Sequence, residues 1–227
     1  MTPALFIELA DIAKEYAVGQ QTLRVLTNIR LFIETGEFLA ITGPSGSGKS
    51  TLLNIIGCLE QPTKGHYIFE GRQVIGENDL SLSRLRANSF GFVFQTFNLV
   101  PALTVFENVA LPFLYSRTNN RTAREKTLDA IEQVGLAHRL NHRPAELSGG
   151  EMQRAAIARA IAIKPKLILA DEPTGNLDSH AGKNILRIFK QLNNHGTAIV
   201  MVTNDQDVAA FAQRTIYIRD GEIAASA

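Results

Sequence analysis

The stretch "GPSGSGKST", residues 43–51, decides how the rest of the chain is interpreted. It stands between the apolar run "EFLAIT" and the segment "TLLNIIGCL", so it joins a predicted strand to a predicted helix. Glycines in such a loop allow backbone N–H groups to turn inward on phosphate oxygens, and the helix N-terminus adds the positive end of its dipole. Lys49 supplies a point charge, and the Ser50 hydroxyl can ligate Mg²⁺. The sequence therefore predicts a nucleotide-phosphate site in this segment, the phosphate loop.

Strands alternate with helices along most of the chain. Residues 5–43 show the alternation typical of strands, and the pairs Glu70-Gly71 and Asp220-Gly221 predict hairpins. Helical periodicity then runs from about residue 98 to residue 147, broken by prolines, so this block looks inserted. Two apolar runs, "KLILADE" and "TAIVMVTND", each follow a predicted helix. Buried strands that alternate with helices predict a parallel sheet covered on both faces.

The composition limits the possible partners and the compartment. The chain has 227 residues, 45% of them hydrophobic, and its 23 Lys and Arg residues nearly balance 22 Asp and Glu residues. No overall field therefore attracts nucleic acid or an anionic membrane surface. The single cysteine, Cys58, is expected to be a small buried apolar residue, and the absence of a secretory signal favours a reducing, cytoplasmic compartment. Because no apolar run approaches the roughly 20 residues needed to cross a bilayer, any membrane-spanning part is expected on another chain.

The run "LILADE", residues 167–172, is an apolar strand that ends in two carboxylates. Ligands of open α/β sheets collect at this edge. Asp171 is expected to hold Mg²⁺, directly or through water, and Glu172 is expected to orient and polarise an attacking water. Taken alone, two acids at a strand end are often only a solvated strand end, so this interpretation depends on the phosphate loop.

The segment "LSGGEMQR", residues 147–154, is a second glycine turn that leads into a second helix, this time without a lysine. Ser148, Gly149 and Gly150 offer a hydroxyl and backbone N–H groups at a positive helix end, which predicts a second anion site. A plain helix N-cap is the alternative interpretation. Glu151 is expected at the first helical position as an acid favoured by the dipole.

The order of these motifs resembles that of the ATP-binding cassette (ABC) ATPases, over essentially the whole chain. "GPSGSGKST", "LSGGEMQR" and "LILADEPTGNLDS" are similar to the Walker A, signature, and Walker B with D-loop motifs. "NIIGCLEQPTKG" and "LTVFENVALP" resemble the branch that contains lipoprotein-release, macrolide-efflux and cell-division ATPase subunits. The resemblance implies an α/β P-loop NTPase (RecA-like) fold, with a mostly parallel sheet flanked by helices, an N-terminal antiparallel β subdomain and an inserted α-helical subdomain. A single domain, 1–227, is expected, with a core of 1–94 and 150–227 and a helical signature subdomain of 95–149.

The resemblance also assigns roles to individual residues. Tyr16 matches the aromatic residue that stacks on adenine, and Gln95 stands at the Q-loop position. The residues implied to contact ATP are Tyr16, Gly43, Ser45, Gly46, Gly48, Lys49, Ser50 and Thr51, with Ser148, Gly149 and Gly150 acting from a second copy. The implied Mg²⁺ ligands are Ser50, Gln95 and Asp171, and the implied catalytic residues are Glu172, Gln95, Asn204 and Asp178.

The family's architecture predicts the partners. Two copies would pair head to tail, so that ATP on one phosphate loop is capped by the signature turn (residues 147–150) of the other, with Asp178 near the seam. An integral membrane permease would dock on the helical subdomain and the Q-loop, on the cytoplasmic face of the inner membrane. The basic run of residues 116–126 is expected to begin a solvated helix, with contact to lipid headgroups or the permease as the alternative.

Asn204 departs from the family pattern. A histidine that contacts the γ-phosphate usually follows "VT", whereas this chain has asparagine there, which is shorter, neutral and without a second ring nitrogen. Slow but real hydrolysis is expected, because Glu172, Gln95 and Lys49 remain. An ATP-gated regulatory clamp with little turnover is the alternative. A DNA-maintenance ATPase is disfavoured by the short helical block and the lack of a basic face or zinc cluster in the sequence, so no nucleic-acid partner is expected.

Overall fold

The computed structural model describes residues 5–115 and 118–224. The chain divides into two compact units, one formed by residues 1–83 with 196–227 and the other by residues 84–195. The expected helical subdomain, 95–149, lies entirely within the second unit. Ser116 and Arg117 of the basic run lie outside the described residues.

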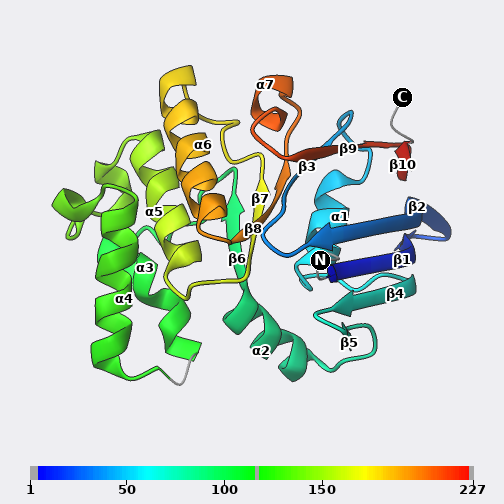
Figure 1. The fold of residues 1–227 in the computed structure, drawn as a ribbon, viewed down its shortest axis with the longest axis horizontal. Helices are drawn as coiled ribbons and strands as arrows, with labels where there is room; N and C mark the ends of the chain where they lie inside the picture. The colour runs from blue at the N-terminus through cyan, green and yellow to red at the C-terminus, as the bar shows by residue number, and fades with distance from the viewer. Residues whose placement is uncertain (1–4, 116–117, 225–227) are drawn as a thin grey trace. The chain divides into compact units, whose positions relative to one another are not determined.

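An antiparallel sheet forms one part of the first unit, with strand order β2-β1-β4-β5 (Figure 1). These strands are β1 (Leu5–Val18), β2 (Gln21–Glu34), β4 (Lys64–Phe69) and β5 (Arg72–Gln73). From Leu26 to Glu34, β2 mostly alternates between buried and exposed residues, as expected where one face meets the core. The hairpin predicted at Glu70-Gly71 is confirmed, and both residues have positive φ angles, 49° and 76°.

The same unit contains strands of a mixed sheet: β3 (Phe38–Thr42), β8 (Ala198–Val202), β9 (Arg214–Arg219) and β10 (Glu222–Ala224). β3 pairs in parallel with β8 and β9, and β9 turns back antiparallel into β10, which confirms the closing hairpin. Every residue of β3 and β8 is buried, as expected for central parallel strands. Helix α1 (Lys49–Ile56) packs on β8 and β2, and the short helix α7 (Gln206–Ala209) packs on β3.

The second unit pairs two parallel strands, β6 (Phe90–Phe94) and β7 (Leu167–Asp171), with helices. Its helices are α3 (Val105–Ala110), α4 (Asn120–Gln133), α5 (Gly149–Ile161) and α6 (Ser179–Asn194), joined by 3₁₀ turns at Leu111–Tyr115, Ala137–Arg139 and Pro144–Glu146. Helix α5 is central, because it packs against β6, α3, α4 and α6 (Figure 1). The helical character predicted for residues 98–147 is confirmed. No helix among the described residues is long and apolar enough to span a bilayer.

Two elements have no counterpart in the sequence prediction. Helix α2 (Asp79–Ser89) is mostly polar and buries little apart from Leu82 and Ser89, so no apolar stripe marks it. Strand β6, "FGFVF", is a short apolar run without alternation, and periodicity alone does not distinguish such a run from a buried helix turn. The predicted basic helix start is present, since Asn119 caps α4 through a bond from the Thr122 N–H.

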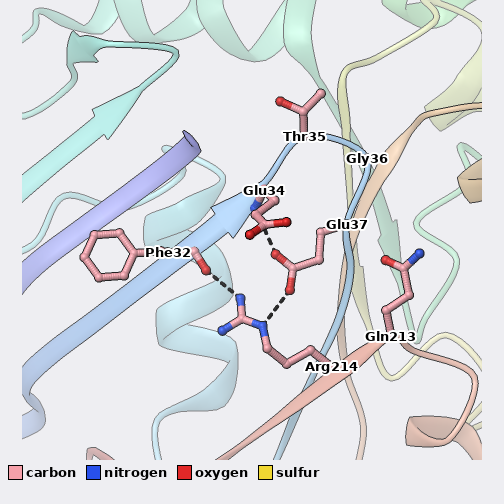
Figure 2. A pocket seen from close by; sticks show the side chains of 7 residues that line it. All are labelled: Phe32, Glu34, Thr35, Gly36, Glu37, Gln213 and Arg214. Carbon is pink, nitrogen blue, oxygen red and sulfur yellow. Dashed lines mark hydrogen bonds and ion pairs between the residues drawn. The ribbon is translucent and has the colours of Figure 1, made fainter. Parts of the chain in front are cut away.

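A polar hollow of about 570 Å³ lies beside the β2–β3 turn (Figure 2). The Arg214 guanidinium bridges it, with Nε 2.6 Å from Glu37 Oε1 and Nη2 2.5 Å from the Phe32 carbonyl oxygen. Gln213 accepts a bond from the Phe38 N–H at 2.8 Å, which fixes the start of β3. None of its seven lining residues is among those expected to bind nucleotide, so the hollow is part of the scaffold that positions β3.

Gly91 of β6 tests the packing of the second unit. A Cβ atom at Gly91 would lie 2.6 Å from the Ala160 carbonyl oxygen and 3.1 Å from Pro165, and a backbone carbonyl has little room to move. We expect Gly91→Ala to lower the free energy of unfolding by about 1–3 kcal/mol, measured by urea denaturation. Gly182→Ala in α6 is the matched control. Its Cβ would meet Thr174 at an ordinary 3.6 Å, so stability should be unchanged or raised. Equal effects of the two changes would contradict this description of the packing.

Candidate functional site

The phosphate loop is held between β9 and β2 by close backbone approaches. Gly43 has a φ angle of 143°, and a Cβ there would collide with the Ile218 carbonyl oxygen. Gly48 has a φ angle of 101°, and its Cβ would lie 2.7 Å from Leu26 and 2.9 Å from the Val25 carbonyl oxygen. Only glycine satisfies both the conformation and the space at these positions. The loop therefore has little freedom in where its N–H groups are placed.

The side chain of Lys49 is buried and folds back on the phosphate loop. Its Nζ donates to the carbonyl oxygens of Gly43 at 2.9 Å and Pro44 at 2.7 Å, so the ammonium group lies where a bound phosphate would need a cation. The Ser47 hydroxyl is also buried and has no hydrogen-bond partner within the described ranges. A buried polar atom without a partner and a cradle that a Cβ would fill both fit a phosphate group.

Tyr16 is fixed at its hydroxyl end. It donates to Glu60 Oε2 at 2.8 Å, while Lys14 Nζ lies 2.9 Å from Glu60 Oε1 and 4.9 Å from the centre of the tyrosine ring. Burial, followed by the bond to Glu60, raises the pKa of Tyr16, and a bond with the Thr51 hydroxyl acts in the opposite direction. Tyr16 therefore stands beside Thr51, the last residue of the phosphate loop. Glu60, which orients the ring, was not predicted.

Asn204 follows β8 at the edge of the sheet where the phosphate loop follows β3. The two strands are parallel and Ile41 pairs with Val202, so the segments that begin at Gly43 and Asn204 leave the sheet at the same end. Thr203 is buried and donates its N–H to the Ile41 carbonyl oxygen at 3.1 Å. Asn204 itself is exposed. The fold thus brings Asn204 to the phosphate-loop edge.

The second unit contains the remaining residues that were expected to form the ATP site. Phe94 pairs with Asp171, so Gln95 and Glu172 leave neighbouring parallel strands at the same level. Gln95 donates from Nε2 to Asn176 Oδ1 at 3.4 Å, and Asn176 donates back to the Gln95 carbonyl oxygen at 3.0 Å. This turns the amide nitrogen of Gln95 toward Asn176, so the amide oxygen is the atom that would bind a cation. Glu172 adopts a left-handed conformation, with a φ angle of 44°, which marks a sharp turn at the end of the strand.

Gln153 of α5, which was not predicted, connects the ends of β6 and β7 by hydrogen bonds. Its side chain is fully buried and donates from Nε2 to the Pro173 carbonyl oxygen at 2.7 Å and the Phe94 carbonyl oxygen at 3.4 Å. It therefore links the helix of the signature motif to the backbone just before Gln95 and just after Glu172. The only signal in the sequence is a polar residue on the buried side of an amphipathic helix.

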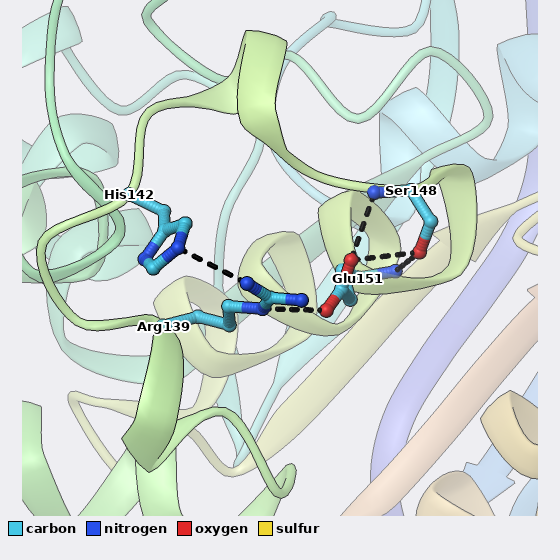
Figure 3. Close-up of polar contacts among 4 residues, drawn as sticks. All are labelled: Arg139, His142, Ser148 and Glu151. Carbon is cyan, nitrogen blue, oxygen red and sulfur yellow. Dashed lines mark hydrogen bonds and ion pairs between the residues drawn. The ribbon is translucent and has the colours of Figure 1, made fainter.

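The signature turn is a capped helix start (Figure 3). Ser148 is the N-cap of α5, its Oγ accepts from the Glu151 N–H at 3.3 Å, and Glu151 Oε2 accepts from the Ser148 N–H at 2.9 Å. The expectation that Glu151 occupies the first helical position is wrong, because the helix begins at Gly149 and places Glu151 third. Hydrogen bonds from the Ser148 backbone, with further contributions from its hydroxyl and from Arg139, lower the pKa of Glu151 to about 2.

Asp178 also caps a helix. Its Oδ1 accepts hydrogen bonds at the start of α6 from the N–H groups of His180 at 2.9 Å and Ala181 at 2.8 Å. These bonds lower the pKa of Asp178, and the bond from Ala181 has the largest effect. The carboxylate is exposed at the end of the segment that follows Glu172. Its conformation is therefore fixed by the backbone, and its side chain remains accessible.

The family profile described as "ABC transporter" matches residues 26–175, which is more than half of the chain. The chain belongs to the ABC transporter ATPase family. The "Uncharacterized ABC transporter ATP-binding protein YvrO" of Bacillus subtilis (strain 168) is 48% identical over 96% of this chain and 95% of its own length. The "Macrolide export ATP-binding/permease protein MacB" of Marinobacter nauticus is also 48% identical, but this chain spans only 35% of it.

Solved structures agree on fold and chemistry. A dimeric structure of the cassette MJ0796 superposes with a TM-score of 0.89 at 44% identity, covering 96% of this chain and 97% of that one. A second structure of MJ0796 is a dimeric post-hydrolysis state bound to ADP and Pi. The predicted fold class is therefore confirmed, and the chain is an ABC ATPase that binds ATP.

The Glu151 carboxylate of this ABC ATPase gives a pH test of the capping box. An ordinary glutamate pKa of 4.5 falls to about 2 in the folded chain, so the ionised group stabilises the fold fully above about pH 4.5. That contribution is lost as the pH falls from 4.5 toward 2. The unfolding midpoint of Glu151→Gln should lie below that of the unaltered chain at pH 7. The difference between the two midpoints should become smaller as the pH falls from 4.5 toward 2. A gap of constant size would contradict the assignment.

Proposed function

We propose that this chain is the ATP-binding and ATP-hydrolysing subunit of a transporter or a related transenvelope export complex, and that two copies pair head to tail over ATP. One observation carries the proposal. A single chain holds two different glycine-rich edges at helix starts, the phosphate loop with its buried Lys49 and the lysine-free signature turn capped by Ser148, and we propose that both bind phosphate. Two such edges complement each other when two copies face in opposite directions. The dimeric structures of MJ0796 support the pairing of two copies.

In this proposal the residues that contact ATP are divided between two copies. Tyr16 stacks on the base, and the triphosphate lies on the phosphate loop, where Ser45, Gly46 and Thr51 join Lys49. The turn formed by Ser148, Gly149 and Gly150 of the second copy caps the γ-phosphate, and Asp178 lies beside the seam. Because the triphosphate then makes charge-assisted bonds to both copies, loss of the phosphate weakens the pairing.

Oxygen donors fit a magnesium ion. We propose that the Ser50 hydroxyl, the Gln95 amide oxygen and the Asp171 carboxylate hold it, since hard divalent cations take such ligands. When bound, the ion would neutralise charge on the phosphate oxygens. Glu172, at the sharp backbone turn that ends β7, orients and polarises the attacking water.

A separate membrane permease completes the proposed machine. Residues 95–149, which contain Gln95 and the helices after it, form the docking face, and the chain acts at the cytoplasmic face of the membrane. MacB is named as an ATP-binding/permease protein, and this chain matches about a third of it. We infer that the permease named in MacB lies in its remaining two thirds, and that a separate chain supplies the corresponding part here.

Hydrolysis measured against protein concentration tests the paired site. With Mg²⁺ present, the rate per chain should rise with concentration and then level off, because each active site needs a second copy. Glu172→Gln should lower the rate by about a hundredfold or more. Glu132→Gln, which changes an exposed carboxylate on α4, should leave it unchanged. A rate per chain that does not depend on concentration would contradict pairing.

The alternative is an ATP-gated clamp with little turnover, favoured by Asn204 in place of the expected histidine. We expect Asn204→His to raise turnover by about tenfold or more in the paired state, because a ring nitrogen reaches further and can bridge to a second group. Single-turnover hydrolysis is the measurement, and Asn194→His, at an exposed position at the end of α6, is the control. An unchanged or lower rate would mean that Asn204 is not what limits hydrolysis.

A further inference from the structure

The signature turn carries an ionised carboxylate within hydrogen-bond distance of its serine (Figure 3). Glu151 Oε2 lies 2.9 Å from the Ser148 hydroxyl oxygen, and in this arrangement the hydroxyl donates its only proton to the carboxylate. The serine then presents lone pairs to an approaching anion, and the carboxylate adds a like charge. A triphosphate can be bound here only if the charge of Glu151 is offset.

Arg139 supplies the offsetting charge. Its Nε lies 2.9 Å from Glu151 Oε1, on the opposite side of the carboxylate from Ser148 (Figure 3). Its Nη1 lies 3.0 Å from Nε2 of His142, which must be the acceptor because a guanidinium has none. The Glu151 side chain is only 13% exposed and that of Arg139 34%, so solvent and salt screen this pair less than an open surface pair.

The backbone that carries Arg139 is anchored on a different helix. The Val105 N–H donates to the His142 carbonyl oxygen at 2.8 Å, and the Phe106 N–H donates to the Leu140 carbonyl oxygen at 3.0 Å. Both donors belong to the first turn of α3, whose own N-cap is Thr104. The backbone next to Arg139 is therefore held by α3, while its guanidinium contacts Glu151 on the helix that Ser148 caps.

We propose that Arg139 is a positioning residue of the signature turn, which holds the Glu151 carboxylate on Ser148 and cancels its charge so that the turn can accept the triphosphate bound by a second copy. This inference rests on the proposed head-to-tail pairing. It adds two residues, Arg139 and Glu151, to those that determine how tightly two copies close on ATP. It also connects α3, in the proposed docking segment, to the serine through Arg139 and Glu151.

The test is ATP-dependent pairing, measured by sedimentation in a Glu172→Gln chain that retains ATP. Arg139→Ala should raise the protein concentration for half-pairing by about tenfold, because it leaves Glu151 uncompensated. Adding Glu151→Gln should restore pairing to within about threefold, since glutamine keeps an acceptor oxygen for Ser148 but has no charge. Rescue by removal of a charge is not expected if Arg139 acts only by packing.

Two controls separate the possible failures. Arg121→Ala, which breaks an exposed ion pair with Glu125 on α4, should not change pairing. Binding of a fluorescent ATP analogue to the single chain should be equal in the Arg139→Ala and reference chains, because the phosphate loop is in the other unit. The unfolding midpoint of Arg139→Ala should fall because the ion pair with Glu151 is lost, so pairing is compared at a temperature where both chains are fully folded. Unchanged pairing in Arg139→Ala, or a double variant no better than the single one, would overturn the role of Arg139. A reference chain that never pairs with ATP would overturn the proposed function itself.

Discussion

The close approach of backbone to backbone around the phosphate loop is the constraint on which the nucleotide half of the molecule depends. Gly43 and Gly48 stand against carbonyl oxygens of β9 and β2, and Gly221 stands against the Val25 carbonyl oxygen with its own N–H bonded to the Ser47 carbonyl oxygen at 3.2 Å. Side chains at these positions would force the strands apart. The loop is thus shaped before any ligand arrives, which lowers the cost of ordering N–H groups around a phosphate.

The sequence predicts much of this fold because its strongest signals are local. The phosphate loop, the two buried strands and both hairpins are each specified within ten residues, by glycine position or by continuous apolar character. Helix α2 escapes prediction because it has no apolar stripe. Strand β6 escapes because five apolar residues suit a strand and a helix turn equally well.

The site was predictable only where a motif covers it. Lys49, Glu172 and Ser148 lie in motifs, whereas the residues that hold site residues in place come from distant segments. Glu60 meets Tyr16 across 44 positions, and Gln153 reaches Pro173 across 20. Such contacts depend on how strands and helices pack, and a single sequence gives no periodic signal for them. The wrong prediction of Glu151 at the first rather than the third helical position has a different origin, because Ser148 followed three residues later by Glu151 is a local signature of a capping box and was present in the sequence.

The two anion-binding edges differ in a way that suits their proposed tasks. At the phosphate loop, a lysine ammonium is bound by carbonyl oxygens of its own loop, which hold the positive charge in a fixed position. At the signature turn the charges of Arg139 and Glu151 nearly cancel, and what remains for a ligand is backbone N–H groups and the helix end. In the proposed function, this fixed cation holds the nucleotide throughout the cycle. A nearly neutral edge gives up its phosphate contacts when the terminal phosphate leaves, because little charge attraction opposes separation. Neutralising the signature turn therefore favours a pairing that responds to the presence of the terminal phosphate, and this is the property that a reversible ATP-driven closure requires.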